Sequence, residues 1–156
     1  MKRAYRSGGV GAMMDEYERA ASDVERIVSG ISDAEFELMR DTRTTDPNCR
    51  SIQTIVNHMI GSGYGYADYI RQAFSVPSER PAAAVLGRTQ SLEAFRSMLD
   101  YTIRTLEGRW NYSDEQTGAV HINSRWGVQY DMEQMLEHAI VHVLRHRRQI
   151  ERFLGT

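Results

Sequence analysis

Three histidines lie four residues apart near the end of the chain: His138, His142 and His146. Side chains four positions apart stand one above the other on a helix, so two imidazoles can bind the same metal ion. The whole sequence contains five histidines, and this segment therefore holds more than half of them. The spacing predicts a metal site on a helix near the C-terminus.

The apolar face of this helix indicates which two histidines would bind. At about 100° per residue and with His142 at zero, the apolar face is centred near 110°. His146 lies at about 40°, close to that face, whereas His138 lies about 150° from its centre and is expected to point to solvent. A rise of about 12 Å also separates His138 from His146, too far for one ion. The apolar face consists of Met132, Leu136, Ala139, Ile140, Val143, Ile150 and Leu154.

His58 lies in a second amphipathic helix and has a matching position. It flanks the apolar face of its own helix by about the same angle as His142 does. Two helices packed through their apolar faces would bring these flanks together. Ser62 and Gly65 follow His58 on the same side and are candidate pocket residues. The apolar face here consists of Ile52, Ile55, Val56, Met59, Tyr66 and Ile70.

The same helix carries glycines at positions 61, 63 and 65. Each mid-helix glycine costs roughly 1 kcal/mol relative to alanine, so the three together need an explanation. Room for an ion, a water molecule and a substrate beside His58 is one explanation.

Three neutral imidazoles with one open position are typical of a catalytic metal site. A fourth protein ligand, such as His138 or His121, would instead indicate a structural site. The histidines also have a simpler interpretation as ordinary surface or half-buried helix residues. Gln149 lies about 20° from His142 and is a candidate hydrogen-bond partner of a metal ligand.

Helical periodicity accounts for most of the chain and predicts an all-α four-helix bundle. Residues 1–12 are expected to be a flexible extension, followed by a single domain over residues 13–156. The segment 109–130 is rich in aromatic residues and is expected to form a long loop or lid, with a short extended piece at 119–122. The predicted helices span 13–30, 51–74, 91–108 and 131–154, with a short helical turn after Ser32.

The bulk composition excludes several kinds of partner. The 156 residues carry a formal net charge of −2, which offers no electrostatic case for a nucleic acid or a membrane surface. No segment has the long apolar run of a signal peptide or a membrane span. The single cysteine, Cys49, excludes an internal disulfide and fits a reducing compartment, so we expect a cytoplasmic protein.

The segment from His142 to Ile150 resembles the C-terminal motif of the DinB/YfiT-like metalloproteins. In that motif two histidines lie four apart, and the second is followed by arginine, a small residue, glutamine and an aliphatic residue. His58 matches the family's lone histidine on the second helix. The matching residues of the motif are His142, His146, Arg147, Gln149 and Ile150; the departures are Arg148, where glycine is usual, and Arg145, where another histidine is common.

This resemblance implies a four-helix bundle with a crossover connection, a homodimer, and a divalent metal such as zinc or nickel. The implied ligands are His58, His142 and His146, with Gln149 and His138 around them. Characterised members include S-transferases and isomerases that use low-molecular-weight thiols, where the metal would lower the pKa of the thiol and present a thiolate to a small-molecule substrate. Two other interpretations are a metal-dependent hydrolase and a non-catalytic, metal-stabilised bundle in a stress response.

Overall fold

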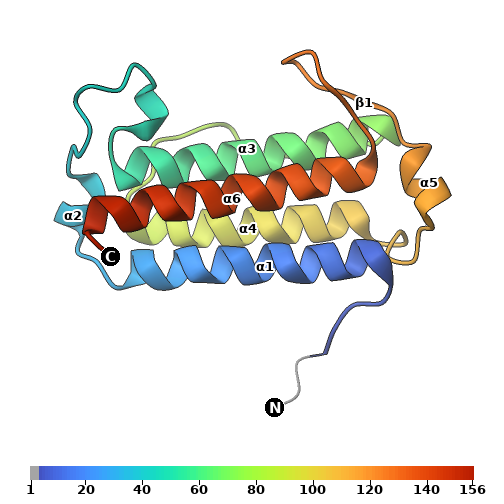
Figure 1. Ribbon diagram of the computed structural model, residues 1–156, viewed down its shortest axis with the longest axis horizontal. Coiled ribbons are helices and arrows are strands. Elements are labelled where there is room, and N and C mark those ends of the chain that lie inside the picture. Colours follow the sequence, from blue (N-terminus) through green and yellow to red (C-terminus); the bar gives the residue numbers. More distant parts are fainter. Residues whose placement is uncertain (1–3) are drawn as a thin grey trace.

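The computed structural model describes residues 4–156, and the chain is mostly helical, as the sequence predicts. Four long helices lie side by side (Figure 1). The long helices are α1 (Gly8–Ser29), α3 (Ile52–Ala73), α4 (Arg88–Leu106) and α6 (Met132–Leu154). The short elements are α2 (Asp33–Glu37), the 3-10 turn η1 (Pro47–Cys49), α5 (Asp114–Gly118), β1 (Ile122–Asn123) and β2 (Gln129–Tyr130).

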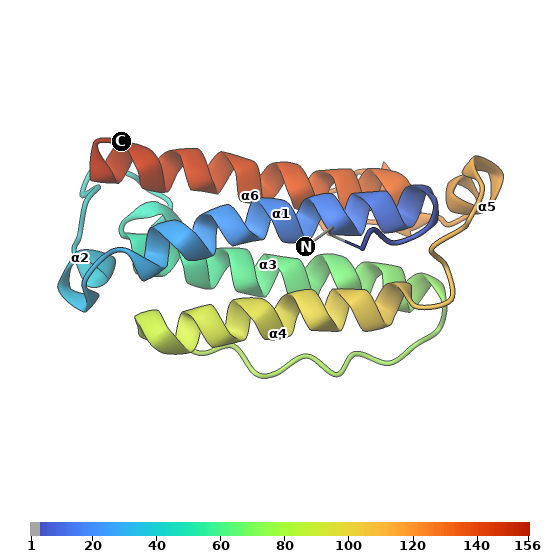
Figure 2. The same ribbon diagram turned by 90° about the horizontal axis from the view of Figure 1, so that it is seen from below.

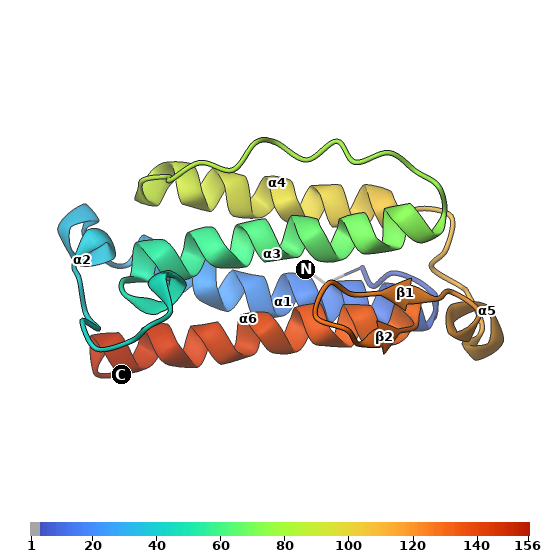
Figure 3. The same ribbon diagram turned by 90° about the horizontal axis from the view of Figure 1, so that it is seen from above.

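The four long helices run in two directions. α1 and α6 run one way, and α3 and α4 run the opposite way (Figure 3). α3 packs against α4 and α6, and α1 packs against the same two helices. Because α3 and α4 point in the same direction, the segment that joins them returns along the helices (Figure 2). We call this segment, residues 74–87, the connecting segment.

The helices that carry the histidines begin where capping chemistry places them. The Ser51 hydroxyl accepts a hydrogen bond from the backbone N–H of Thr54 (3.1 Å), and the Asp131 carboxylate accepts one from Gln134 N–H (2.7 Å). Each cap satisfies a donor that the first turn of a helix leaves free. Gly155 ends α6 at a φ of 75°, a left-handed conformation that favours glycine. The predicted bounds of these two helices are therefore correct to within a residue.

The start of α1 corrects part of the predicted extension over residues 1–12. α1 begins at Gly8, so residues 8–12 form its first turn, and Val10 is buried in the core. The adjacent glycines at positions 8 and 9 concealed this start, because glycine is a poor helix former. Residues 1–3 of the predicted extension lie outside the described residues.

The turn before α1 is held by the rest of the protein. Gly8 has a φ of 74°, and a side chain there would overlap the backbone of Trp110. The backbone N–H of Arg6 donates to the buried carboxylate of Asp15 (2.9 Å), and the Arg6 guanidinium also pairs with Glu18. The chain is thus fastened to α1 from Arg6 onward.

The aromatic segment 109–130 contains regular structure that the sequence did not predict. α5 occupies its middle, and β1 pairs antiparallel with β2, with Ile122 opposite Tyr130. Of the predicted extended piece at 119–122, only Ile122 is in a strand. Two-residue strands are too short to show the alternation by which strands are recognised in a sequence. The turn of this hairpin carries Trp126.

The core lies between the four long helices and contains the apolar faces predicted for α3 and α6 almost completely. α4 begins at Arg88 instead of the predicted Ser91, which is buried at the helix start. None of the helices formed by residues 4–156 combines the length and the hydropathy needed to cross a membrane.

Candidate metal centre

His58 on α3 meets His142 and His146 on α6. The Nε2 atom of His142 lies 3.0 Å from that of His58 and 3.2 Å from that of His146. Two nitrogen ligands on a tetrahedral ion, each about 2.0–2.1 Å from it, are separated by about 3.3 Å. All three side chains are half-buried, and their ligand atoms lie within 4.8 Å of one another. The three histidines chosen from the sequence therefore converge with a spacing suited to one ion.

The electrostatics of the cluster keep these imidazoles neutral. Burial, followed by repulsion from His146 and His58, lowers the pKa of His142 to about 3. Burial is also the main cause of the lowered pKa of His58 and of His146. The Asp46 carboxylate acts in the opposite direction on both. A neutral imidazole offers a lone pair, which is the form that binds a metal.

Gln149 orients one of the three histidines. Its Oε1 atom lies 3.0 Å from Nδ1 of His146, one helical turn back along α6. An amide oxygen only accepts hydrogen bonds, so His146 Nδ1 carries the proton and its Nε2 keeps the lone pair that faces the cluster. Gln149 thus makes the contact that its position on the helix predicted.

His138 does not point to solvent, although its angle on the helix predicted that it would. It is half-buried rather than directed to solvent, because the hairpin covers it: the Trp126 ring stacks on its imidazole at 5.5 Å and 23°. Its Nδ1 atom lies 3.4 Å from the Tyr130 hydroxyl. The Tyr66 ring packs edge-on against both His138 (5.1 Å) and His142 (5.6 Å). His138 is therefore connected to the cluster through Tyr66.

The cluster found among residues 4–156 has three members, and neither alternative fourth ligand joins it. His121 is exposed in the segment before β1. Cys49 is the last residue of η1, and burial is the main cause of the raised pKa of its thiol. A raised pKa disfavours the thiolate that a metal or an electrophile would need.

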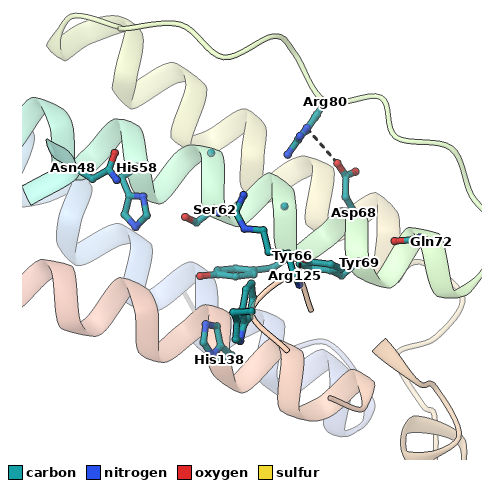
Figure 4. A pocket seen from close by; sticks show the side chains of 13 residues that line it. Asn48, His58, Ser62, Tyr66, Asp68, Tyr69, Gln72, Arg80, Arg125 and His138 are labelled. Atoms are coloured by element: carbon teal, nitrogen blue, oxygen red, sulfur yellow. Dashed lines mark hydrogen bonds and ion pairs between the residues drawn. The ribbon is translucent and has the colours of Figure 1, made fainter. Parts of the chain in front are cut away.

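A pocket of about 790 Å³ opens beside His58 (Figure 4). Both predicted pocket residues, Ser62 and Gly65, lie in its wall, together with His138 and the hairpin residue Trp126. The wall also contains Asn48, Gly61, Tyr66, Asp68, Tyr69, Gln72, Arg80 and Arg125. Small-molecule sites usually have volumes of about 300–1,000 Å³, so this pocket is large enough for a substrate.

The glycines of α3 have two different explanations. A side chain at Gly63 would overlap the side chain of Met98 on α4, so Gly63 allows close packing of two helices rather than room for an ion. A Cβ at Gly61 would meet nothing within 4 Å, and one at Gly65 would meet only Arg80, at 3.9 Å. The predicted explanation is therefore wrong for Gly63, whereas Gly61 and Gly65 border open space, and for them the explanation stays a prediction.

Two arginines in the pocket wall, Arg80 and Arg125, were not predicted from the sequence. Arg80, from the connecting segment, pairs with Asp68 on α3 at 3.4 Å. The guanidinium groups of Arg125 and Arg145 are exposed near the histidines and pair with no acidic side chain in the described part of the chain. Arginine in exposed segments is common, so no sequence signal distinguishes Arg80 and Arg125.

The sequence profile of the DinB family matches residues 4–154. The chain belongs to the DinB family. The match covers all four long helices and the three clustered histidines, and it begins before Gly8, in agreement with the early start of α1. No curated protein matches this DinB chain in a sequence comparison. The family and the three-histidine cluster together permit a metal-binding protein of the DinB type.

Proposed function

We propose that this DinB protein binds one divalent metal ion, zinc or nickel, through His58, His142 and His146. The carrying observation is the convergence of three neutral imidazoles whose Nε2 atoms lie 3.0 and 3.2 Å apart. Three nitrogen donors without a carboxylate suit zinc or nickel better than magnesium or calcium. The helix arrangement supports the four-helix bundle with a crossover connection that the resemblance implies; the homodimer stays a prediction.

We propose further that the site is catalytic and transfers a low-molecular-weight thiol to a small-molecule substrate. A bound ion with three protein ligands keeps a position open, where it lowers the pKa of a thiol or a water molecule. The chain contributes the surroundings of that position. Gln149 orients His146, while the packed rings of Tyr66 and Trp126 line one side of the pocket. Ser62 and Gly61 leave space next to His58.

Two alternatives use the same cluster. A metal-dependent hydrolase would activate water instead of a thiol. A non-catalytic bundle, in a stress response or another role, would use the ion only to tie α3 to α6. The pocket of about 790 Å³ beside His58 favours an enzyme, because a purely structural ion needs no such space.

Elemental analysis of the purified protein tests the metal site. We expect near-stoichiometric metal in the wild type and in His121→Ala, and almost none in His58→Ala or His142→Ala. His121 is the matched control, because it is exposed and does not belong to the histidine cluster. Absence of metal from the wild type after reconstitution with zinc and with nickel would refute the proposal.

A spectroscopic titration separates the three functions. Cobalt(II) in the site serves as a visible probe, and free cysteine or glutathione is the added thiol. The transferase predicts an intense near-ultraviolet band from a thiolate that binds the cobalt. The hydrolase predicts only a pH-dependent change of the visible bands, and a closed structural site predicts neither.

A further inference from the structure

A second cavity lies on the other side of α3 from the histidines, under the connecting segment. Its volume is about 610 Å³, within the usual range of small-molecule sites. Its wall is mainly apolar, with Ile60 and Tyr64 from α3, Ala94 from α4, and the roof residues Pro81, Ala82, Ala83, Ala84 and Leu86. A space of this size beside mainly apolar side chains suits the apolar part of a small molecule.

The two cavities meet at two residues. Gly61 and Arg80 lie in the walls of both. A side chain at Gly61 would project into open space, and helix packing does not require glycine there, in contrast to Gly63. The missing side chain at position 61 therefore leaves open space where the walls of the two cavities adjoin.

Arg80 supplies a positive charge at this junction. Its side chain is 52% exposed and reaches over Gly65 to Asp68, at 3.4 Å. The Asp68 carboxylate has other partners besides Arg80, because it also accepts hydrogen bonds from the hydroxyls of Ser78 (2.8 Å) and Tyr101 (2.6 Å). The guanidinium keeps donors available for an anionic group where the two cavities adjoin.

The roof of the apolar cavity is fastened only at its two ends. At one end the Arg71 guanidinium donates to the carbonyl of Pro77 (2.8 Å). At the other end the Leu86 N–H donates to the Asn57 side chain (3.0 Å). Residues 81–85 between them make no hydrogen bond with any part of the chain that the structure describes. The roof spans the cavity without filling it, and its small alanine side chains preserve the space.

We propose that this cavity binds the apolar part of the substrate, whose anionic group pairs with Arg80 and whose reacting end reaches the histidines. The substrate class is therefore a small molecule that joins an anion to an alkyl chain or a ring. This inference rests on the proposed function for the identity of the reacting end. The binding of the apolar group and of the anion stands on the cavity, Gly61 and Arg80 alone.

Calorimetric titration of the metal-free protein with butanoate, hexanoate and octanoate tests this proposal. Each methylene that leaves water strengthens binding roughly fourfold, so affinity should rise by about an order of magnitude for every two methylenes. Gly61→Val should retain the weak binding of butanoate and lose the increase with chain length. Gly9→Val is the matched control, since Gly9 is also helical and surrounded by open space, and it should behave as the wild type.

Two further variants address the remaining walls. Ala94→Leu fills the cavity from α4 without touching the histidine pocket, and it should weaken octanoate much more than butanoate. Circular dichroism will show whether Gly61→Val folds. If it does not, Ala94→Leu alone tests whether the cavity binds the alkyl chain. Arg80→Gln should weaken all three alkanoates by the same factor, and the matching n-alcohols should not respond to it.

An affinity that does not change with chain length in the wild type would overturn the proposal, as would an undiminished increase in both Gly61→Val and Ala94→Leu. The metal content of the same preparations is measured separately. A protein that binds octanoate as described but no metal would refute the proposed function and leave this inference standing. A protein that binds metal but shows no chain-length effect would refute this inference and leave the proposed function standing.

Discussion

At the scale of single residues, His146 differs from His58 and His142 because, among residues 4–156, only its second ring nitrogen has a hydrogen-bond partner. Gln149 holds that nitrogen at 3.0 Å and so determines both the tautomer and the orientation of the ring. Partners of this kind contribute about 10- to 100-fold to metal affinity in other sites. The single hydrogen bond is therefore a point at which the proposed site can be weakened without removing a ligand.

We expect Gln149→Ala to lower zinc affinity by about 10- to 100-fold, measured by competition with a chromogenic chelator. Gln149→Glu keeps an acceptor oxygen at the same place and should retain most of the affinity. Arg148→Ala, an exposed change on the same helix, is the control. Equal affinities for the Gln149→Ala variant and the wild type would show that His146 needs no support.

The lowered pKa of His142 predicts how the metal-free protein responds to acid. Its ordinary value is 6.5, and burial with neighbouring histidines brings it to about 3. Between these values the unfolded chain binds a proton at this residue and the folded chain does not. The free energy of unfolding is thus highest above pH 6.5 and falls as the pH decreases toward 3.

We therefore expect the metal-free wild type to lose stability between about pH 7 and about pH 5, as measured by urea unfolding in the presence of a chelator. His142→Gln removes the titrating group and should lose less over the same interval. Parallel losses in the two proteins would mean that His142 does not contribute to the acid sensitivity.

At the scale of elements, α3 contributes both to helix packing and to the proposed site. It touches α4 along one side, where Gly63 lies against Met98, and it borders both cavities along another, where Gly61 lies. Two glycines separated by one position thus serve opposite purposes. One brings two helices close together and the other leaves space open.

This difference predicts opposite effects of the same substitution. Gly63→Ala should lower the free energy of unfolding by about 1–3 kcal/mol, because Met98 is fully buried and also accepts a hydrogen bond from Tyr17. Gly61→Ala should raise it by roughly 0.5–1 kcal/mol, since alanine reduces the freedom of the unfolded chain. Chemical denaturation measures both, and a similar shift for both variants would contradict the assignment.

At the scale of the whole molecule, the histidine cluster joins two helices that are far apart in the sequence. His58 lies on α3 and the other two histidines on α6, so one ion would bind the folded protein and find no equivalent site in the unfolded chain. Such binding stabilises a fold by mass action. The proposed metal is therefore also a component of the stability of the fold.

We expect a chelator to lower the melting temperature of the metal-loaded wild type. At a free metal concentration about 100 times its dissociation constant, the ion contributes roughly 2.7 kcal/mol, which corresponds to about 5–10 °C in a chain of this size. His58→Ala should melt at the same temperature with and without chelator. Scanning calorimetry measures the effect, and a chelator-insensitive wild type would argue against an ion that bridges α3 and α6.

The sequence by itself determined the helices, their caps and the candidate ligands. Ser51 and Asp131 mark helix starts because a cap is a contact over three residues, and the positions of His58 and His142 follow from periodicity within a single helix. Prediction failed where local signals were weak or misleading. The paired glycines hid the start of α1, and the two-residue strands that bring Trp126 onto His138 were too short to recognise.

Only the tertiary structure decided what surrounds the histidines. Arg80 reaches Asp68 because the connecting segment returns along the helices, and Gly61 borders two cavities because that segment supplies wall residues to both. No local pattern separates Gly61 from Gly63, since their difference lies in what α4 and the connecting segment place beside them. The candidate ligands can be found from the periodicity of each helix separately. A pocket, in contrast, forms only between segments that are far apart in the sequence and that folding brings together.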